Sequence, residues 1–331
     1  MVGTLATAGT DQTIRLWDPA TGQSWHTIQY KEQGVDKQVN ALEFMPGSTN
    51  LAVAGFNHIK LFDLASQSTE PLAKFEGHKN NITAVGFHRD GKWMFSGSED
   101  GTVKVWDIRA KNFQRDFTHP GPVNSAVLHP NQGEIIAGDS RGNVAVWDLA
   151  TATMSTAFQP EADVPVQSIS IAQDNTVLAA ATSSGTVYLW APPSSSADYT
   201  PLRQLQAHRS YILRTQLSPD AKYLATCAAD KTVKVWDAAH DFSPLTTLTG
   251  HTQWVWDCRF SADSQYLVTA SSDKTARLWE LASGEAVHAY QGHHKGVLAC
   301  ALNDEMELGG RSSATPSMAA ASAASQDLDS P

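Results

Sequence analysis

The sequence contains no run of basic residues, and its formal net charge is −10 over 331 residues. A protein that binds nucleic acid through its phosphates needs clustered Lys and Arg, so we do not expect a nucleic-acid partner. No segment approaches the roughly 18 consecutive apolar residues of a membrane span, so we expect no direct membrane insertion. The first residues also lack the basic start and the long apolar core of a signal peptide.

Cysteine is scarce as well: Cys227, Cys258 and Cys300 lie far apart, each inside a strand-like pattern. This usage is typical of reduced core thiols in an intracellular protein. The chain has no phosphate-binding P-loop, no dinucleotide fingerprint and no GxSxG elbow. The adjacent His293 and His294 do not have the spacing of a metal site. We therefore predict that the protein is not an enzyme and has no catalytic residue, cofactor or metal.

What the chain does have is a repeat. Seven short apolar runs end in an aromatic residue, with intervals of 41 to 46 residues: Trp17, Phe62, Trp106, Trp147, Trp190, Trp236 and Trp279. A period of roughly 40–45 residues with a terminal Trp-Asp pair is typical of the four-stranded blade of a WD40 propeller. One blade cannot bury its apolar face alone, so the blades must stack around an axis. The prediction is an all-β, seven-bladed WD40 β-propeller over residues 1–303.

The third repeat shows the order of strands within a blade. Alternating apolar residues and turn signals predict its strands at Ile82–Phe87, Trp93–Gly97, Thr102–Trp106 and Asn112–Phe117. Matching inner strands are predicted elsewhere at Val39–Phe44, Val123–Leu128, Val166–Ile171, Ile212–Leu217, Val255–Phe260 and Val297–Leu302.

The two ends of the repeat array are each incomplete. The chain opens at Thr4–Ala8, which reads as a second strand with no first. Near the other end, Val297–Leu302 reads as a first strand with no successors. We expect this C-terminal strand to complete the N-terminal blade, because that pairing closes the ring and removes both free sheet edges.

A polar pattern accompanies the Trp residues. In a complete WD blade a His before the inner strand bonds an Asp in the second turn, and a Ser or Thr links the pair to the Trp. The Asp lies six residues before the Trp, and the Ser or Thr four before the Asp. Three blades contain the whole set: His78, Ser96, Asp100 and Trp106; His208, Thr226, Asp230 and Trp236; His251, Thr269, Asp273 and Trp279. The opening blade has Thr7, Asp11 and Trp17, and its His can only be His293.

These sets of four, which we call tetrads, could be mistaken for hydrolase triads. They recur in four blades at fixed spacing to a Trp, which a single active site would not do, so we interpret them as structural networks. Blades two, four and five have Phe56, Arg141 and Ser184 at the Asp position. We expect these three blades to lack the network and to depend more on packing.

The loops that enter the inner strands gather on one rim, around the mouth of the central channel. The residues there are mostly amides and aromatics with few charges, which is typical of a protein-binding surface: Gln38, Asn40, Asn80, Asn81, Asn124, Gln167, Tyr211, Trp254 and Trp256. Alternate residues of a strand share a face, so both indoles of Trp254 and Trp256 should point the same way. The alternative, that both fill core between blades, stays open. Trp25 and Trp93 are expected to be packing residues.

Composition changes after the last repeat. Residues 304–331 are rich in Ser and Ala and cannot bury enough apolar surface to fold, so we predict a disordered tail. Residues 191–198 (APPSSSAD) are predicted to form a long exposed loop in blade five.

Several segments resemble one particular family. Asn80–Arg109, His129–Leu149 and Trp254–Glu280 are similar to the small G-β-like WD-repeat subunit of the TOR kinase complexes. The Asn57-His58-Ile59 departure in blade two, with Phe62 where Trp is usual, resembles that family too. The resemblance covers essentially residues 1–303.

The resemblance implies a non-catalytic subunit that sits on the C-lobe of the TOR kinase domain. There it would grip an insertion beside the active-site cleft, stabilise the active kinase and narrow substrate access. In that family the channel-mouth rim makes the contact, at positions matched in this chain by Gln38, Asn40, Asn81, Trp254 and Trp256. We add Asn124 by geometry alone.

The same resemblance implies that raptor-like or rictor-like subunits join the assembly. It also implies a cytoplasmic location, with peripheral association with endomembranes through the TOR complex. A scaffold or substrate receptor of another protein complex is the alternative function. A ribosome-bound propeller would need a basic face against RNA, and the net negative charge of this chain argues against that function.

Overall fold

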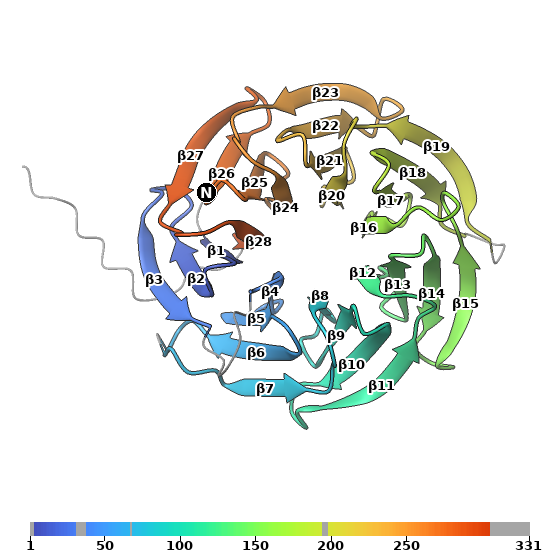
Figure 1. The fold of residues 1–331 in the computed structure, drawn as a ribbon, viewed down its shortest axis with the longest axis horizontal. Coiled ribbons are helices and arrows are strands. Elements are labelled where there is room, and N and C mark those ends of the chain that lie inside the picture. Colours follow the sequence, from blue (N-terminus) through green and yellow to red (C-terminus); the bar gives the residue numbers. More distant parts are fainter. Residues whose placement is uncertain (1–2, 31–37, 67, 194–197, 305–331) are drawn as a thin grey trace, which may run out of the picture.

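A computed structural model describes residues 3–30, 38–66, 68–193 and 198–304. The described residues form seven four-stranded antiparallel sheets, arranged as blades around a central channel (Figure 1). All their regular elements are strands. The predicted seven-bladed, all-β propeller is confirmed.

In each blade the four strands follow one another from the channel outward. Blade one consists of β28 (Val297–Asn303), β1 (Thr4–Gly9), β2 (Thr13–Trp17) and β3 (Ser24–Gln29), and blade two of β4 (Ala41–Phe44), β5 (Asn50–Ala54), β6 (His58–Asp63) and β7 (Ala73–Glu76). Blade three consists of β8 (Ile82–Phe87), β9 (Trp93–Ser98), β10 (Thr102–Asp107) and β11 (Asn112–Thr118), and blade four of β12 (Val123–Leu128), β13 (Glu134–Asp139), β14 (Val144–Asp148) and β15 (Thr153–Phe158).

The remaining three blades keep the same order. Blade five consists of β16 (Val166–Ile171), β17 (Leu178–Thr182), β18 (Thr186–Ala191) and β19 (Thr200–Gln206). Blade six consists of β20 (Ile212–Leu217), β21 (Tyr223–Ala228), β22 (Val233–Asp237) and β23 (Ser243–Leu248). Blade seven consists of β24 (Val255–Phe260), β25 (Tyr266–Ser271), β26 (Thr275–Glu280) and β27 (Glu285–Gln291).

Blade one is built from both ends of the described chain, as predicted. Strand β28 pairs antiparallel with β1, with Leu302 opposite Leu5 and Cys300 opposite Thr7 (Figure 1). The register shifts near Gly9, where the backbones approach so closely that a Cβ would lie 2.0 Å from the carbonyl oxygen of Gly296. Pairing at this point removes the two sheet edges that an open ring would expose.

The apolar core is divided among the interfaces between neighbouring blades and does not form one central cluster. Each of seven buried clusters joins neighbouring blades, and the Trp of a blade packs toward the preceding blade. Trp106, for example, is fully buried against Ile59 and Phe75 of blade two. Burying each such side chain contributes about 1.5–3 kcal/mol, so a blade is stable only when both neighbours are present.

The same Trp residues mark an irregularity in the outer half of the blade. In six blades the pairing of the third and fourth strands shifts register immediately before the Trp. Blade two has Phe62 at this place, and its β6–β7 pairing is regular. The bulge therefore coincides with the Trp in these six blades, and bulges are known to redirect a side chain.

Some predicted boundaries differ from the structure. Strand β4 begins at Ala41 and not at Val39, because the amide of Val39 donates to the carbonyl of Gly9 in blade one instead of pairing along blade two. The predicted tail lies outside the described residues from 305 onward, while Asp304 accepts a hydrogen bond from the amide of Ala262 at 2.7 Å. The middle of the predicted blade-five loop, residues 194–197, is likewise outside them.

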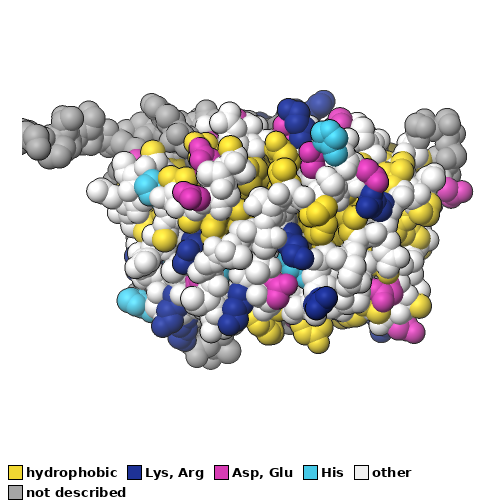
Figure 2. Space-filling view, turned by 90° about the horizontal axis from the view of Figure 1, so that it is seen from above, with side chains coloured by type: hydrophobic (Ala, Val, Ile, Leu, Met, Phe, Trp, Pro, Cys, Tyr) yellow, Lys and Arg dark blue, Asp and Glu magenta, His cyan; other side chains and the backbone are white. Residues whose placement is uncertain are grey.

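The outer edge of the ring carries mixed side chains. Figure 2 shows basic and acidic groups interspersed with apolar ones, and neither sign of charge dominates this face. The exposed apolar side chains recur near the start of the outer strands: Phe113, Met154, Leu202, Leu245 and Val287. Apolar residues scattered in this way are normal on a protein surface, so these five residues do not by themselves indicate a docking site.

Candidate partner-binding site

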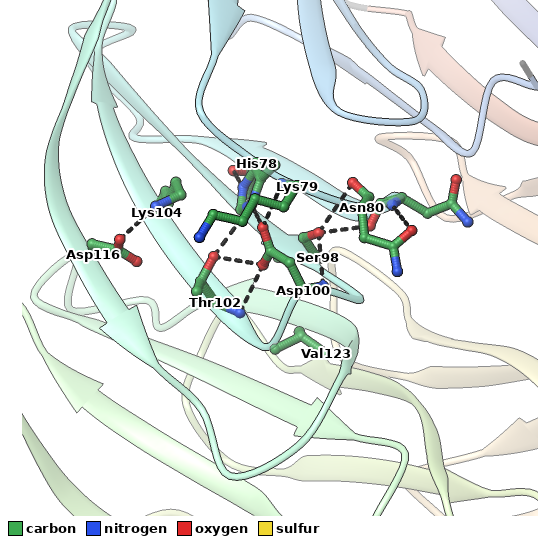
Figure 3. A network of polar contacts seen from close by, with 12 residues as sticks. His78, Lys79, Asn80, Ser98, Asp100, Thr102, Lys104, Asp116 and Val123 are labelled. Carbon is green, nitrogen blue, oxygen red and sulfur yellow. Dashed lines mark hydrogen bonds and ion pairs between the residues drawn. The ribbon is translucent and has the colours of Figure 1, made fainter. Parts of the chain in front are cut away.

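The first predicted set of polar residues is assembled in blade three, where Figure 3 shows His78 and Asp100 beside Thr102. His78 Nδ1 lies 2.9 Å from Asp100 Oδ2, and His78 Nε2 lies 2.7 Å from Ser96 Oγ. The indole of Trp106 donates to the same Ser96 oxygen at 2.8 Å. Burial alone would raise the pKa of Asp100, but hydrogen bonds from His78 and Thr102 hold it well below its usual value. The carboxylate is thus kept charged by its partners.

Blade one assembles the same network from the two ends of the chain. His293 Nδ1 lies 2.8 Å from Asp11 Oδ2, and His293 Nε2 lies 2.8 Å from Thr7 Oγ1. The indole of Trp17 donates to Thr7 Oγ1 at 2.7 Å. Burial would raise the pKa of Asp11, yet hydrogen bonds from His293 and Thr13 lower it well below the usual value. The ring is therefore closed by side chains as well as by the strand pair.

Blades six and seven repeat the arrangement. The His–Asp distances are 2.8 Å and 2.7 Å, and the His–Thr distance is 2.8 Å in both: His208, Asp230 and Thr226; His251, Asp273 and Thr269. Trp236 and Trp279 donate to these Thr hydroxyls at 3.2 Å and 2.9 Å. In all four tetrads the His and the Ser or Thr are buried and every member is hydrogen-bonded within its own network, although the Asp230 side chain stays 31% exposed.

Blade four corrects one expectation. It does contain a buried His–Asp pair, although Arg141 occupies the expected Asp position: His119 Nδ1 lies 3.2 Å from Asp139 Oδ2, with both side chains fully buried. Burial lowers the pKa of His119 despite the nearby carboxylate. The hydroxyl position holds Ala137, and the indole nitrogen of Trp147 has no hydrogen-bond partner. The spacing rule missed the pair because Asp139 comes two residues earlier than in the tetrads.

Blade five uses a different acid in place of the His–Asp pair. Glu161 accepts hydrogen bonds from Ser184 at 2.7 Å and from Tyr188 at 3.3 Å. Thr182 adds a longer bond of 3.4 Å to the same oxygen. The sequence pattern did not reveal this cluster, since its acid sits in a loop outside the spacing of the tetrads. In blade two, Phe56 stands at the Asp position as read from the sequence.

A polar cavity of about 600 Å³ occupies the channel. Five of the predicted partner-binding residues line it: Gln38, Asn40, Asn81, Asn124 and Trp256. They come from the loops and first residues of the inner strands, so one end of the ring brings them together from blades two, three, four and seven. Trp254 does not line the cavity but lies beside Trp256, with ring centroids 5.7 Å apart.

The amides are partly engaged with the ring itself. Gln38 donates to Asn40 Oδ1 at 2.9 Å, and Asn81 donates to Glu99 Oε2 at 2.9 Å. Asn124 donates to the backbone carbonyl of Val166 in blade five at 2.9 Å. That bond gives Asn124 a structural role between blades, and it holds the amide in one orientation at the channel wall.

The two indoles differ in exposure. Trp254 is 42% exposed and precedes β24, so it is not core, which excludes the packing alternative for this residue. Trp256 is half-buried, and its indole donates to Ser272 Oγ at 2.6 Å. Val255 between them is fully buried. The indole of Trp254 is therefore exposed on the rim, while that of Trp256 is held against the channel wall.

Charged pairs deeper in the channel were not foreseen from the sequence. Arg214 Nε lies 3.1 Å from Asp257 Oδ1, and Arg259 donates to Glu43 Oε2 at 2.9 Å. Burial raises the pKa of Glu43, although Arg259 and Arg214 oppose the shift. Asp257 also accepts from the amide of Cys300 at 3.0 Å. Both pairs join side chains of different blades, so they connect the blades along the wall of the channel.

The three cysteines lie in the core. Cys227, Cys258 and Cys300 are free and fully buried, and burial raises the thiol pKa of Cys227 and Cys300 far above the usual value. Among the residues that the structure describes, no three His, Cys, Asp or Glu side chains gather as metal ligands. Within the same residues, no helix has the length and apolar character to cross a bilayer.

Comparisons with known proteins agree with this architecture. The family model of the first β-propeller of IFT122 matches residues 38–308. Wat1, a target of rapamycin complex subunit of Schizosaccharomyces pombe, is 49% identical over 303 residues, which cover 91% of this chain and 95% of the relative. The subunit LST8 of Saccharomyces cerevisiae is 47% identical over 91% of this chain and 98% of its own length. LST8 of Bos taurus is 42% identical over 70% and 72% of the two chains.

Proposed function

Because this chain belongs to the LST8 family of target of rapamycin (TOR) complex subunits, we propose that it is the non-catalytic WD40 subunit of such a complex. Its partner is the TOR kinase catalytic subunit, which it binds through the channel-mouth rim. The observation that carries this proposal is the exposed indole of Trp254 beside the amide-lined channel. An aromatic anchor surrounded by hydrogen-bonding groups is the usual centre of a protein interface.

In this proposal the ring sits on the C-lobe of the kinase domain, beside the active-site cleft. A propeller is stiff because each blade is packed between two neighbours, so it can hold a kinase insertion in one conformation. The ring thereby stabilises the active kinase and narrows substrate access to the cleft. Raptor-like or rictor-like subunits join the same assembly, which places the protein in the cytoplasm and, through the complex, at the surface of endomembranes.

The rim residues have distinct roles in this contact. Trp254 and Trp256 are the anchors, each contributing about 2 kcal/mol or more when buried by the partner. Gln38, Asn40 and Asn81 pair with backbone groups of the kinase insertion. Asn124 borders the same surface with one N–H of its amide bonded to Val166, which leaves its carbonyl oxygen and the second N–H for the partner.

Affinity purification of the tagged chain followed by mass spectrometry tests the assignment. A very large phosphatidylinositol-kinase-like kinase should dominate the recovered proteins. Recovery of a ubiquitin-ligase adaptor or another assembly without this kinase would instead support the alternative of a scaffold or substrate receptor.

Variants of the rim test the binding surface. Trp254→Ala should lower kinase recovery by roughly 30-fold, the equivalent of about 2 kcal/mol. Trp256→Phe keeps an aromatic ring without the bond to Ser272 and should lower recovery less. Leu245→Ala, at an exposed apolar position on the outer edge, is the matched control and should leave recovery unchanged. Thermal unfolding of each variant shows whether the ring is intact.

A further inference from the structure

One carboxylate at the channel mouth is not neutralised. Of the charged residues lining the cavity, Arg214 pairs with Asp257, and Arg259 pairs with Glu43. Glu99 has no cation within ion-pair distance among the residues described, and its side chain accepts from the amide of Asn81 at 2.9 Å. Of the described residues, Glu99 is therefore the one carboxylate of the cavity lining without a cation beside it, at the end where a partner would arrive.

The exposed aromatic groups lie in a different sector of the same rim. Tyr211 immediately precedes β20 and is 54% exposed, and Trp254 immediately precedes β24 and is 42% exposed. The matching positions in blades four and five are occupied by Pro122 and Pro165, and in blade one by Gly296. Among the inner strands that the structure describes, only those of blades six and seven are thus preceded by a large aromatic side chain.

These two sectors face each other across the channel. Figure 1 shows β20 and β24 on one side of the channel and β4 and β8 on the other. The amides of Gln38, Asn40 and Asn81, together with Glu99, belong to blades two and three. The rim is therefore polarised: an aromatic sector at blades six and seven, and a hydrogen-bonding, negatively charged sector at blades two and three.

We propose that the bound kinase segment crosses the channel mouth between these sectors, with apolar side chains on Tyr211 and Trp254 and a basic side chain at Glu99. The inference rests on the proposed function and adds two contact residues and an orientation to it. A basic group is suited to this place because it would pair with the Glu99 carboxylate, whereas an acidic group would be repelled by it. Aromatic side chains are suited to anchor the apolar end, since they bury a large area with few rotatable bonds.

The test measures binding of the purified full-length protein to the purified TOR kinase catalytic subunit. Glu99→Gln keeps the shape and the oxygen that accepts from Asn81 but removes the charge, and it should weaken binding about ten-fold. Tyr211→Ala should also weaken it about ten-fold. The two sites lie on opposite sides of the channel, so the effects should multiply in the double variant. The salt dependence of binding should be smaller for Glu99→Gln than for the parent chain.

The chain offers a closely matched control for the charge. Glu134 accepts from Asn131 Nδ2 at 2.8 Å, which repeats the Asn–Glu contact at the opposite end of a blade, away from the channel mouth. Glu134→Gln should bind as the parent does. Leu202→Ala, 51% exposed on the outer edge, is the control for Tyr211.

The outcomes separate the two proposals. If Trp254→Ala abolishes binding while Glu99→Gln and Tyr211→Ala bind as the parent, the orientation is wrong and the proposed function stands. If Glu99→Gln binds more tightly than the parent, the proposal that a basic group of the partner contacts Glu99 is wrong. If the parent chain does not bind the kinase at all, both the function and the orientation are overturned.

Discussion

Blades one and seven contain the same His–Asp–Thr–Trp network, but only blade seven draws it from one continuous stretch of chain. The bond lengths are nearly equal: His251 lies 2.7 Å from Asp273, and His293 lies 2.8 Å from Asp11. In blade one the bonded residues are 282 positions apart in the sequence. The network is thus a property of the blade and not of its connectivity, and in blade one it has the added task of holding the ring closed.

Blade four differs from both in the position of its acid and in the residue at the hydroxyl position, and the second difference can be altered by one substitution. It has the buried His119–Asp139 pair but Ala137 at the hydroxyl position, and the indole of Trp147 is left without a partner. Comparison of the blades therefore separates the contribution of the His–Asp contact from that of the link to the Trp.

The largest effect is expected in acid, because it acts on several blades together. The carboxyl pKa values of Asp11, Asp100, Asp230 and Asp273 are lowered in the folded protein, since their hydrogen bonds outweigh the opposing effect of burial. A lowered folded-state pKa contributes stability that is present above the unfolded value of 3.8 and is lost as the pH falls through the lower folded value. The urea midpoint should therefore fall steeply below about pH 4.

Variants show whether these carboxylates cause the acid loss. Asp11→Asn should flatten the decline below pH 4, while Asp174→Asn in an exposed turn should follow the parent curve. A urea midpoint that stays constant between pH 5 and pH 3 in the parent would contradict the assignment.

Replacement of a tetrad His should have the next largest effect on stability. His293→Ala and His251→Ala should each lower the free energy of unfolding by about 2–3 kcal/mol, because each leaves a buried hydroxyl and a carboxylate without their partner. His240→Ala serves as the control, since its side chain is exposed at 79%. Chemical denaturation measures all three. If only His251→Ala destabilises the protein, the side-chain closure of blade one is wrong.

Removal of the channel-wall pair should have a smaller effect. Arg259 donates to the carbonyl of Cys300 in blade one at 3.3 Å and to Glu43 in blade two at 2.9 Å, so it bridges the closing blade. Arg259→Met should cost about 1–2 kcal/mol, less than a fully buried pair because both side chains retain some contact with water. Glu43→Gln added to Arg259→Met should restore part of the loss in the same assay. No recovery would show that Glu43 is not the group left unpaired.

The smallest expected effect is an increase in stability. Ala137→Ser in blade four places a hydroxyl where the tetrads have one, so that Trp147 and His119 obtain a shared partner. The expected increase in the free energy of unfolding is up to about 1 kcal/mol, measured by denaturation. Ala180→Ser in blade five is the control, because no His precedes its inner strand at the matching position, Ala162. Equal gains in both variants would show that the His pair does not matter.

Much of the ring could be predicted because its determinants are local. The spacing of Trp106 to Asp100 and Ser96 is set within two adjoining strands, so it is visible in the sequence. Even the partner of Thr7 and Asp11 could be identified, because His293 was the one His at the right distance from an inner strand. Each of these residues obeys a rule that holds within a single blade.

The contacts that escaped prediction all join different blades or shift the local spacing. Arg259 reaches over the strand β28 to Glu43, and neither residue belongs to a repeating pattern. Asp139 replaces the acid of the tetrad from two positions away, which a fixed spacing cannot detect. Glu161 acts from a loop, where sequence periodicity carries no information.

The sequence alone determined the number of blades, the strands of each and the joining of the two chain ends, because apolar period and turn residues act over a few neighbouring positions. Only the tertiary structure decided which rim residues stand free: Trp254 is exposed, while Asn124 is bonded to the neighbouring blade. It alone also placed β20, which Tyr211 immediately precedes, across the channel from β8 and β9, the second of which Glu99 immediately follows. The exposure of a side chain and the pairing of its charge depend on how the blades are arranged around the axis. That arrangement involves all seven blades together, so no single repeat of the sequence contains it.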